Sequence, residues 1–295
     1  MVAGGEVLCA GQNGQRGMSQ RRKLQLQLRQ LADIRDIMDA MKNLSLVEVL
    51  KLKNRLVNQQ RMVLELERMA ADFLSFYPYS SRRESSGPDI WILFGSERGF
   101  CGDFNEAVTK NLDHQLQSSA AKQVLLLSIG GKLTRRLEDH PYDIRYINGA
   151  DVAEDIGKTL NGIVGQIGQL QSAFGAGNVY ALFHHADSGQ VACNQLIPPF
   201  QDFQEKHDRF GVQPILNIDP ADFFISLVDD YLYVSLHEIA CMSLLSENYQ
   251  RIQHMTVALQ RLDEQKDELR RHYHIHRQEE ITEELEVILL NTTNV

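Results

Sequence analysis

Apolar residues near the start of the chain recur at steps of three and four positions. They are Leu24, Leu28, Leu31, Ile34, Met38, Met41, Leu44 and Val47. This spacing places the side chains in one stripe along a helix. Neither Gly nor Pro, the residues that most often interrupt helices, occurs between Met18 and Tyr77. The pattern therefore predicts one long helix over 19–78.

The last part of the chain has the same pattern. Its stripe consists of Leu245, Tyr249, Ile252, Met255, Leu259, Leu262, Leu269 and Tyr273. No glycine follows Gly211 and no proline follows Pro220. Asp219 before Pro220 is typical of a helix start, with an acidic cap and a proline in the first turn. We expect a second long helix within 213–295.

Both stripes are narrow, so each helix needs a partner. An antiparallel coiled coil between the two ends of the chain satisfies both. The charges agree with this pairing, because 19–68 holds eleven Lys or Arg against six acids while 219–295 holds six against fifteen. The alternative is two separate helices that pack on one bundle.

The segment 88–212 alternates strand and helix signals. The expected strands are 89–96, 124–130, 143–148, 178–185 and 190–198, the last two closing around an Asp187-Ser188-Gly189 turn. The expected helices are 132–139 and a longer one from about 150–153 to 174. Near-continuous apolar strands that alternate with helices predict an α/β domain with right-handed crossovers. The segment 79–88 is expected to be an exposed polar loop.

Composition narrows the possible functions. The formal net charge of −9 argues against a nucleic-acid partner, which would need a basic surface. Cys9, Cys101, Cys193 and Cys241 lie far apart, which favours a reducing compartment over a disulfide or metal framework. No run approaches the roughly 18 apolar residues that cross a bilayer. Residues 1–18 do not resemble a secretory signal; we expect a disordered tail, or an upstream start artefact with Met18 as the first residue.

Glycines cluster in GSERGFCGDFN, directly after the first expected strand, where they permit a tight turn into a helix. The segment is neither a P-loop nor a GxGxxG motif. Ser96 or Cys101 could act as a nucleophile only with a neighbouring base or a lowered thiol pKa, and the sequence assigns neither. A structural turn is favoured, and no catalytic residue or cofactor is expected.

Three histidines alternate near the end of the last helix. His272 and His276 are four residues apart and could share a helix face to bind a metal. No thiol or carboxylate ligands accompany them in an obvious arrangement. Surface histidines are the favoured interpretation, and no metal site is predicted.

Several motifs together resemble the gamma subunit of F-type ATP synthases, over about 18–290. The loop resembles the family segment S-D-R-G-L-C-G-x-x-N, through Arg98, Gly99, Cys101, Gly102 and Asn105. The last helix matches S-E-x-x-x-R at Ser246, Glu247 and Arg251, and R-Q-x-x-I-T at Arg277, Gln278, Ile281 and Thr282. The first helix matches I-T-K-A-M-K at Ile37, Ala40, Met41 and Lys42.

The resemblance implies a non-catalytic central-stalk rotor with a Rossmann-like domain between two coiled-coil helices. Its partners would be the alpha and beta subunits, an epsilon-type subunit and the membrane c-ring, on the cytoplasmic side of a bacterial inner membrane. The residues implied to contact the catalytic ring are Met41, Arg251, Arg277, Gln278 and Thr282.

The sequence departs from the family where Asp36 and Asp39 replace residues that are usually basic. This favours a divergent gamma subunit, of an alternate type of F-type ATPase. Two other functions are compatible with the residues alone. One is a coiled-coil adaptor whose α/β domain serves for docking; the other is an enzyme that uses the 95–105 loop.

Overall fold

Two long helices begin and end the chain. The computed structural model describes residues 7–77, 87–118, 123–175, 177–200 and 215–293. Helix α1 spans Val7–Phe76 and helix α5 spans Pro220–Thr293. The chain divides into two compact units, residues 1–44 with 255–295, and residues 45–254. Both helices contribute to both units.

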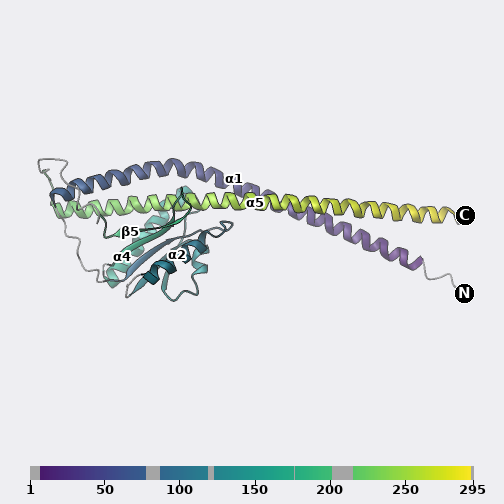
Figure 1. The fold of residues 1–295 in the computed structure, drawn as a ribbon, viewed down its shortest axis with the longest axis horizontal. Coiled ribbons are helices and arrows are strands. Elements are labelled where there is room, and N and C mark those ends of the chain that lie inside the picture. The colour runs from purple at the N-terminus through teal and green to yellow at the C-terminus, as the bar shows by residue number, and fades with distance from the viewer. Residues whose placement is uncertain (1–6, 78–86, 119–122, 176, 201–214, 294–295) are drawn as a thin grey trace. The chain divides into compact units, whose positions relative to one another are not determined.

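The first unit is an antiparallel pair of helices. Arg21 forms an ion pair with Glu280 at 2.8 Å, and Arg35 with Asp263 at 2.9 Å, so rising numbers on α1 meet falling numbers on α5. Met38, Met255 and Leu259 form the buried contact between the helices. In Figure 1 the purple start of α1 and the yellow end of α5 lie at the same end of the pair. The predicted antiparallel pairing is confirmed.

The second unit contains a five-stranded sheet. Its strands are β1 Asp89–Phe94, β2 Val124–Ile129, β3 Asp143–Ile147, β4 Val179–His184 and β5 Val191–Ile197. Their order is β3-β2-β1-β4-β5, with the first four parallel and β5 antiparallel to β4. The expected α/β sheet with a closing strand pair is confirmed.

Helices cover both faces of this sheet (Figure 1). The short helices α2 (Phe104–Ser118) and α3 (Gly131–Arg136) lie on one face, packed on Trp91 and Leu93. Helix α4 (Ile156–Phe174), preceded by a 3-10 turn (Ala153–Asp155), lies on the other face with the second-unit parts of α1 and α5. The direction of winding therefore changes between β1 and β4. In open α/β sheets, ligands usually bind beyond the strand ends at such a point.

One expectation about α1 is wrong. The predicted stripe included Ile34, which is 46% exposed, and continued through Leu44 and Val47, which are 63% and 50% exposed. From residue 45 to 52 the buried positions are instead Ser45, Glu48, Val49 and Leu52. The stripe shifts because α1 here meets the α/β domain, where the Glu48 carboxylate accepts a hydrogen bond from the backbone N–H of Ala153 at 3.0 Å.

The start of α1 also differs from expectation, since the backbone is already helical from Val7 where a disordered tail was expected. Residues 1–6 and most of the expected loop at 79–88 lie outside the described residues. Helix α5 begins at Pro220, as its proline predicts, and the Asp219 carboxylate caps it by accepting from the Ala221 N–H at 2.8 Å.

Candidate functional site

The segment 95–105 forms a closed turn between β1 and α2. The Asn105 amide oxygen accepts from the Ser96 N–H at 2.9 Å, and the Asn105 amide nitrogen donates to the Ser96 hydroxyl at 2.8 Å. Gly95 packs so closely on α3 that an added Cβ would lie 2.3 Å from the Cβ of Leu133. These contacts fix where the turn leaves the sheet.

Acidic side chains join this turn to the ends of β2 and β3. The Glu97 carboxylate accepts from the backbone N–H groups of Gly131 and Gly149, both at 3.0 Å. Arg98 forms an ion pair with Asp151 at 2.9 Å. One side of the turn is thereby held to two neighbouring strand ends.

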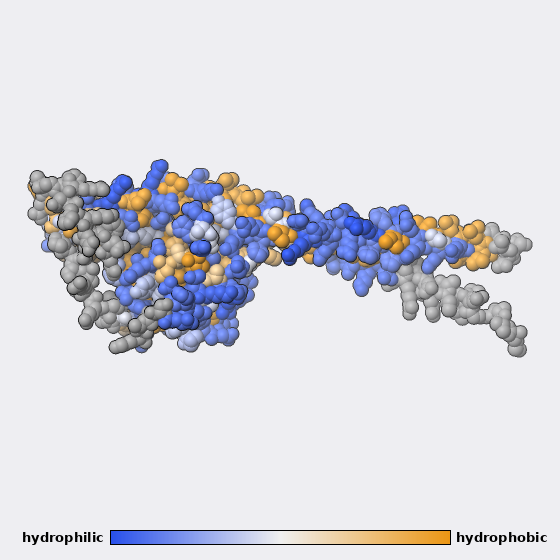
Figure 2. Space-filling view, in the orientation of Figure 1, coloured by the Kyte–Doolittle hydropathy of each residue, from blue (hydrophilic) through white to orange (hydrophobic). Residues whose placement is uncertain are grey.

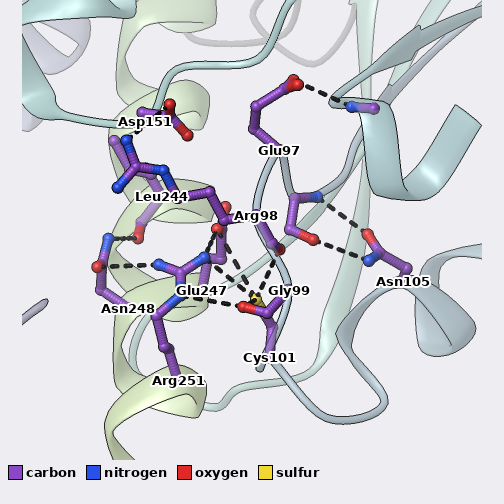
Figure 3. Close-up of polar contacts among 12 residues, drawn as sticks. Glu97, Arg98, Gly99, Cys101, Asn105, Asp151, Leu244, Glu247, Asn248 and Arg251 are labelled. Atoms are coloured by element: carbon purple, nitrogen blue, oxygen red, sulfur yellow. Dashed lines mark hydrogen bonds and ion pairs between the residues drawn. The ribbon is translucent and has the colours of Figure 1, made fainter. Parts of the chain in front are cut away.

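Helix α5 holds the other side of the turn (Figure 3). Arg251 donates to the Gly99 carbonyl oxygen at 3.3 Å and to the sulfur of Cys101 at 3.2 Å. Its guanidinium also forms an ion pair with Glu247, one helical turn earlier, and donates to the Asn248 side-chain oxygen at 3.2 Å. Arg251 and Glu247 are only 5% and 4% exposed. The three polar side chains of α5 form a buried clamp on the turn.

Burial dominates the electrostatics of this cluster. It raises the pKa of Glu247 from 4.5 to about 7, and the adjacent Arg251 guanidinium opposes the shift. Burial and the nearby Glu247 raise the pKa of the Cys101 thiol to about 11. At neutral pH the thiol is protonated, so Cys101 lacks the thiolate that a nucleophile needs.

Helix α5 of the chain itself fills the crevice beyond the end of β1. Gly102 lies so near α5 that an added Cβ would sit 1.9 Å from the Nε2 atom of His254. Ser96, the other conceivable nucleophile, is fully buried and bonded to Asn105. The geometry serves to fasten the turn to α5.

The residues that the family resemblance assigns to a partner fall into two groups. Arg277, Gln278 and Thr282 are exposed, and Met41 is half-buried against the helix pair. Arg251 differs, because all of its hydrogen-bonding nitrogens contact the chain itself. The sequence motif placed Glu247 and Arg251 one turn apart on the last helix, but it gave no sign that both are buried against Cys101.

The histidines near the end of α5 do not converge. His272 and His274 are exposed, and His276 instead lies 2.9 Å from the Glu279 carboxylate. In the part of the chain that the structure describes, no cluster of His, Cys, Asp or Glu is arranged to hold a metal ion. Nor does any helix within those residues have the length and apolarity to cross a bilayer.

The end of α5 is exposed and apolar. Figure 2 shows hydrophobic residues gathered there. They are Ile281, Leu285, Val287, Ile288, Leu289 and Leu290, each exposed by 46% or more. A stretch of this kind is typical of a helix that another protein covers.

Comparison with known proteins matches nearly the whole chain. A family model described as ATP synthase matches residues 20–290. The ATP synthase gamma chain of Bdellovibrio bacteriovorus is 23% identical over 288 residues, covering 91% of this chain and 96% of the relative. The gamma chain of Clostridium botulinum strain Langeland is 24% identical over 272 residues, covering 88% and 94%.

Solved structures share the fold. A chain of the Euglena gracilis mitochondrial ATP synthase, from a structure of its OSCP, F1 and c-ring, aligns with a TM-score of 0.59 at 16% identity, covering 94% of both chains. A chain of the central stalk and c-ring of the Tetrahymena thermophila enzyme aligns at 0.56 with 18% identity, covering 75% of this chain and 99% of the other.

Fold and site together define a class of protein in which the two terminal helices pair and an α/β domain, clamped to the second helix, is inserted between them. The chain belongs to the ATP synthase family, among its gamma chains.

Proposed function

We propose that this chain is the central-stalk rotor subunit of an F-type ATP synthase. It couples ion-driven rotation of a membrane ring to conformational cycling of a catalytic ring of alpha and beta subunits. The observation that carries the proposal is the antiparallel pairing of α1 with α5, seen in the ion pairs of Arg21 with Glu280 and Arg35 with Asp263, in a chain of the gamma family.

The proposed partners are the alpha and beta subunits, an epsilon-type subunit and the c-ring. Support comes from the similar chains in the Tetrahymena and Euglena enzymes, the first from a structure of the central stalk and c-ring and the second from one of OSCP, F1 and c-ring. The bacterial gamma chains among the relatives support a peripheral position on the cytoplasmic side of a bacterial inner membrane. In this role the chain is not itself an enzyme, because the nucleotide chemistry belongs to its partners.

Rotation couples to catalysis through contacts that differ between states of the partner. A rotor without symmetry presents a different face to each catalytic subunit in turn and favours its open or closed state. Arg277 and Gln278 are proposed to bind the ring, because they are exposed and offer several hydrogen-bond donors. Met41 and Thr282 are proposed to lie at the same contact. For Arg251 the clamp supports a different role, which is to hold the turn after β1.

Reconstitution with alpha and beta subunits tests the proposal. The Arg277→Ala/Gln278→Ala variant should retain the folded stability of the parent chain and lose most of the rotation-coupled ATP hydrolysis. The control is Arg271→Ala/Gln265→Ala, which removes an exposed Arg and an exposed Gln from the same helix. Equal coupling in both variants would reject the assigned contact, whereas a parent chain that forms no complex would reject the rotor itself.

A further inference from the structure

A cavity of about 510 Å³ is lined by α1, α5 and the edge strand β5. All of its lining residues belong to the unit formed by 45–254. Helix α1 contributes Glu67, α5 contributes Tyr231, Ser235 and Glu238, and β5 contributes Asn194. Pockets that bind small ligands measure roughly 300–1,000 Å³, so the cavity has room for a small organic molecule.

The lining of the cavity is acidic. Glu67 and Glu238 approach it from different helices, and none of its described lining residues is Lys or Arg. Burial raises the pKa of Glu238, the negative charge of Glu67 raises it further, and His185 opposes the shift. Burial also raises the pKa of the Tyr231 phenol, and the charges of both glutamates add to the increase. The contributions of the two glutamates indicate a negative potential in the cavity, which favours a positively charged ligand.

A buried hydroxyl in the same lining lacks a hydrogen-bond partner. Ser235 is 5% exposed, and its Oγ atom has no partner in hydrogen-bonding geometry among the described residues. The Tyr231 phenol lies near this hydroxyl without reaching that geometry. A buried hydroxyl that is left unpaired is destabilising. Because a serine oxygen accepts hydrogen bonds, a donor bound beside the two acids would satisfy it.

The lining also includes apolar groups. Val63 of α1 and Ile239 of α5 belong to it, together with the rings of Phe200 and Tyr231, whose centroids are 4.5 Å apart. An alkyl chain is stabilised on such groups, and an ammonium group is attracted to the face of an aromatic ring. A bare metal ion fits less well, because no three His, Cys, Asp or Glu side chains in the described part of the chain are placed to hold one.

We propose that this cavity binds a small organic cation with a primary ammonium group on a short alkyl chain, such as a diamine. The ammonium group has three hydrogen-bond donors, which match the two carboxylates and the Ser235 hydroxyl. Its charge offsets the repulsion between Glu67 on α1 and Glu238 on α5, so the bound cation stabilises the packing of both helices around β5. The site uses none of the residues proposed to contact the catalytic ring, and it therefore does not depend on the rotor function.

Titration calorimetry of the purified full chain with diaminobutane tests the site. The parent chain should bind the diamine, and Glu238→Gln, which keeps the size of the side chain, should weaken binding by about tenfold or more. The control is Glu65→Gln, which removes the same charge from an exposed position of α1 outside the cavity and should leave the affinity unchanged. Equal weakening in both variants, or a folded parent chain that gives no heat of binding, would overturn the proposal.

The Ser235→Ala variant separates ligand binding from folding. It removes a buried hydroxyl that has no partner in the free chain, so the free chain should melt at the same temperature or slightly higher. Its affinity for diaminobutane should nevertheless fall by about fivefold. An affinity equal to that of the parent chain, at any melting temperature, would contradict the role of Ser235 in the site.

Two further probes test the chemistry of the ligand. Butanediol has the same length as diaminobutane but no charge, and it should not bind. Tetramethylammonium has the charge but no N–H donor, and it should bind at least about tenfold more weakly than diaminobutane. Comparable affinity for either probe would contradict recognition of a primary ammonium group.

Discussion

Two stretches of the same helix, α5, have opposite surroundings. Every residue in 239–248 is buried, because the sheet, α1 and the 95–105 turn pack on this part of the helix. Every residue in 281–290 is exposed, although six of the ten are large apolar residues. In the first stretch even the charged residue Glu247 is buried, where it forms an ion pair with Arg251. In the second stretch the large apolar residues are exposed to solvent.

The contrast indicates that one stretch of α5 stabilises the fold and the other binds a partner. Substitutions in the buried stretch should change the free energy of unfolding of the chain. Substitutions in the exposed stretch and just before it, at Arg277 and Gln278, should change complex formation and leave unfolding nearly unaltered.

The buried clamp should give the largest effect. Arg251→Ala or Glu247→Ala leaves one buried charge without its partner and should lower the free energy of unfolding by about 3–5 kcal/mol. The double variant Glu247→Leu/Arg251→Met removes both charges and should cost less than either single change. Urea unfolding measures all three, and single variants that lose under about 1 kcal/mol would show that the clamp does not stabilise the fold.

The corrected stripe on α1 gives the next effect. Leu52 is fully buried, so Leu52→Ala should cost about 2–5 kcal/mol through lost burial and a residual cavity. Leu50, two residues earlier, is 66% exposed, and Leu50→Ala should stay within about 0.5 kcal/mol. Comparable losses in the two variants, by thermal or urea unfolding, would mean that the helix faces are assigned wrongly.

The pKa of Glu247 predicts a pH dependence of smaller size. Its folded pKa of about 7 lies above the ordinary 4.5, so between these values the folded state binds more protons than the unfolded state. Stability should therefore fall as pH rises from about 4.5 to 7, by on the order of 3 kcal/mol, and then level off. The Glu247→Gln variant should lose this slope. A wild-type stability that rises across the same window would contradict the shift.

The cap of α5 should give the smallest effect. Asp219→Ala removes the side-chain acceptor for the Ala221 N–H and should cost about 1 kcal/mol. Asp219→Asn keeps a capping oxygen and should cost little. If Ala and Asn at this position have equal stability in the same unfolding assay, the hydrogen bond contributes nothing measurable.

Much of the fold could be predicted from local pattern. The absence of Gly and Pro defined the two helices, Pro220 defined the start of α5, and continuous apolar runs such as Ile90 to Phe94 defined the parallel strands. These signals are local, since they depend on residues within one or two turns of each other. They also predicted an α/β sheet, because the alternation of strands and helices along the chain restricts the possible topologies.

The clamp could not be predicted because it joins residues that are distant in sequence. Arg251 meets Gly99 and Cys101 across about 150 positions, and neither the charge of Arg251 nor the helical stripe indicates that contact. The shift of the α1 stripe from Leu44 to Ser45 has the same origin. There Glu48 of α1 accepts a hydrogen bond from the backbone N–H of Ala153 on the α/β domain. The spacing of apolar residues within α1 cannot indicate this contact.

Rotation of single complexes tests the central claim most directly. Cys193 is exposed while Cys101 and Cys241 are buried, so in a Cys9→Ser background a bead can be attached to this chain at Cys193. With alpha and beta subunits fixed to a surface and ATP supplied, the bead should rotate continuously in one direction. A bead that only fluctuates, in complexes that contain this chain and hydrolyse ATP, would contradict the rotor account.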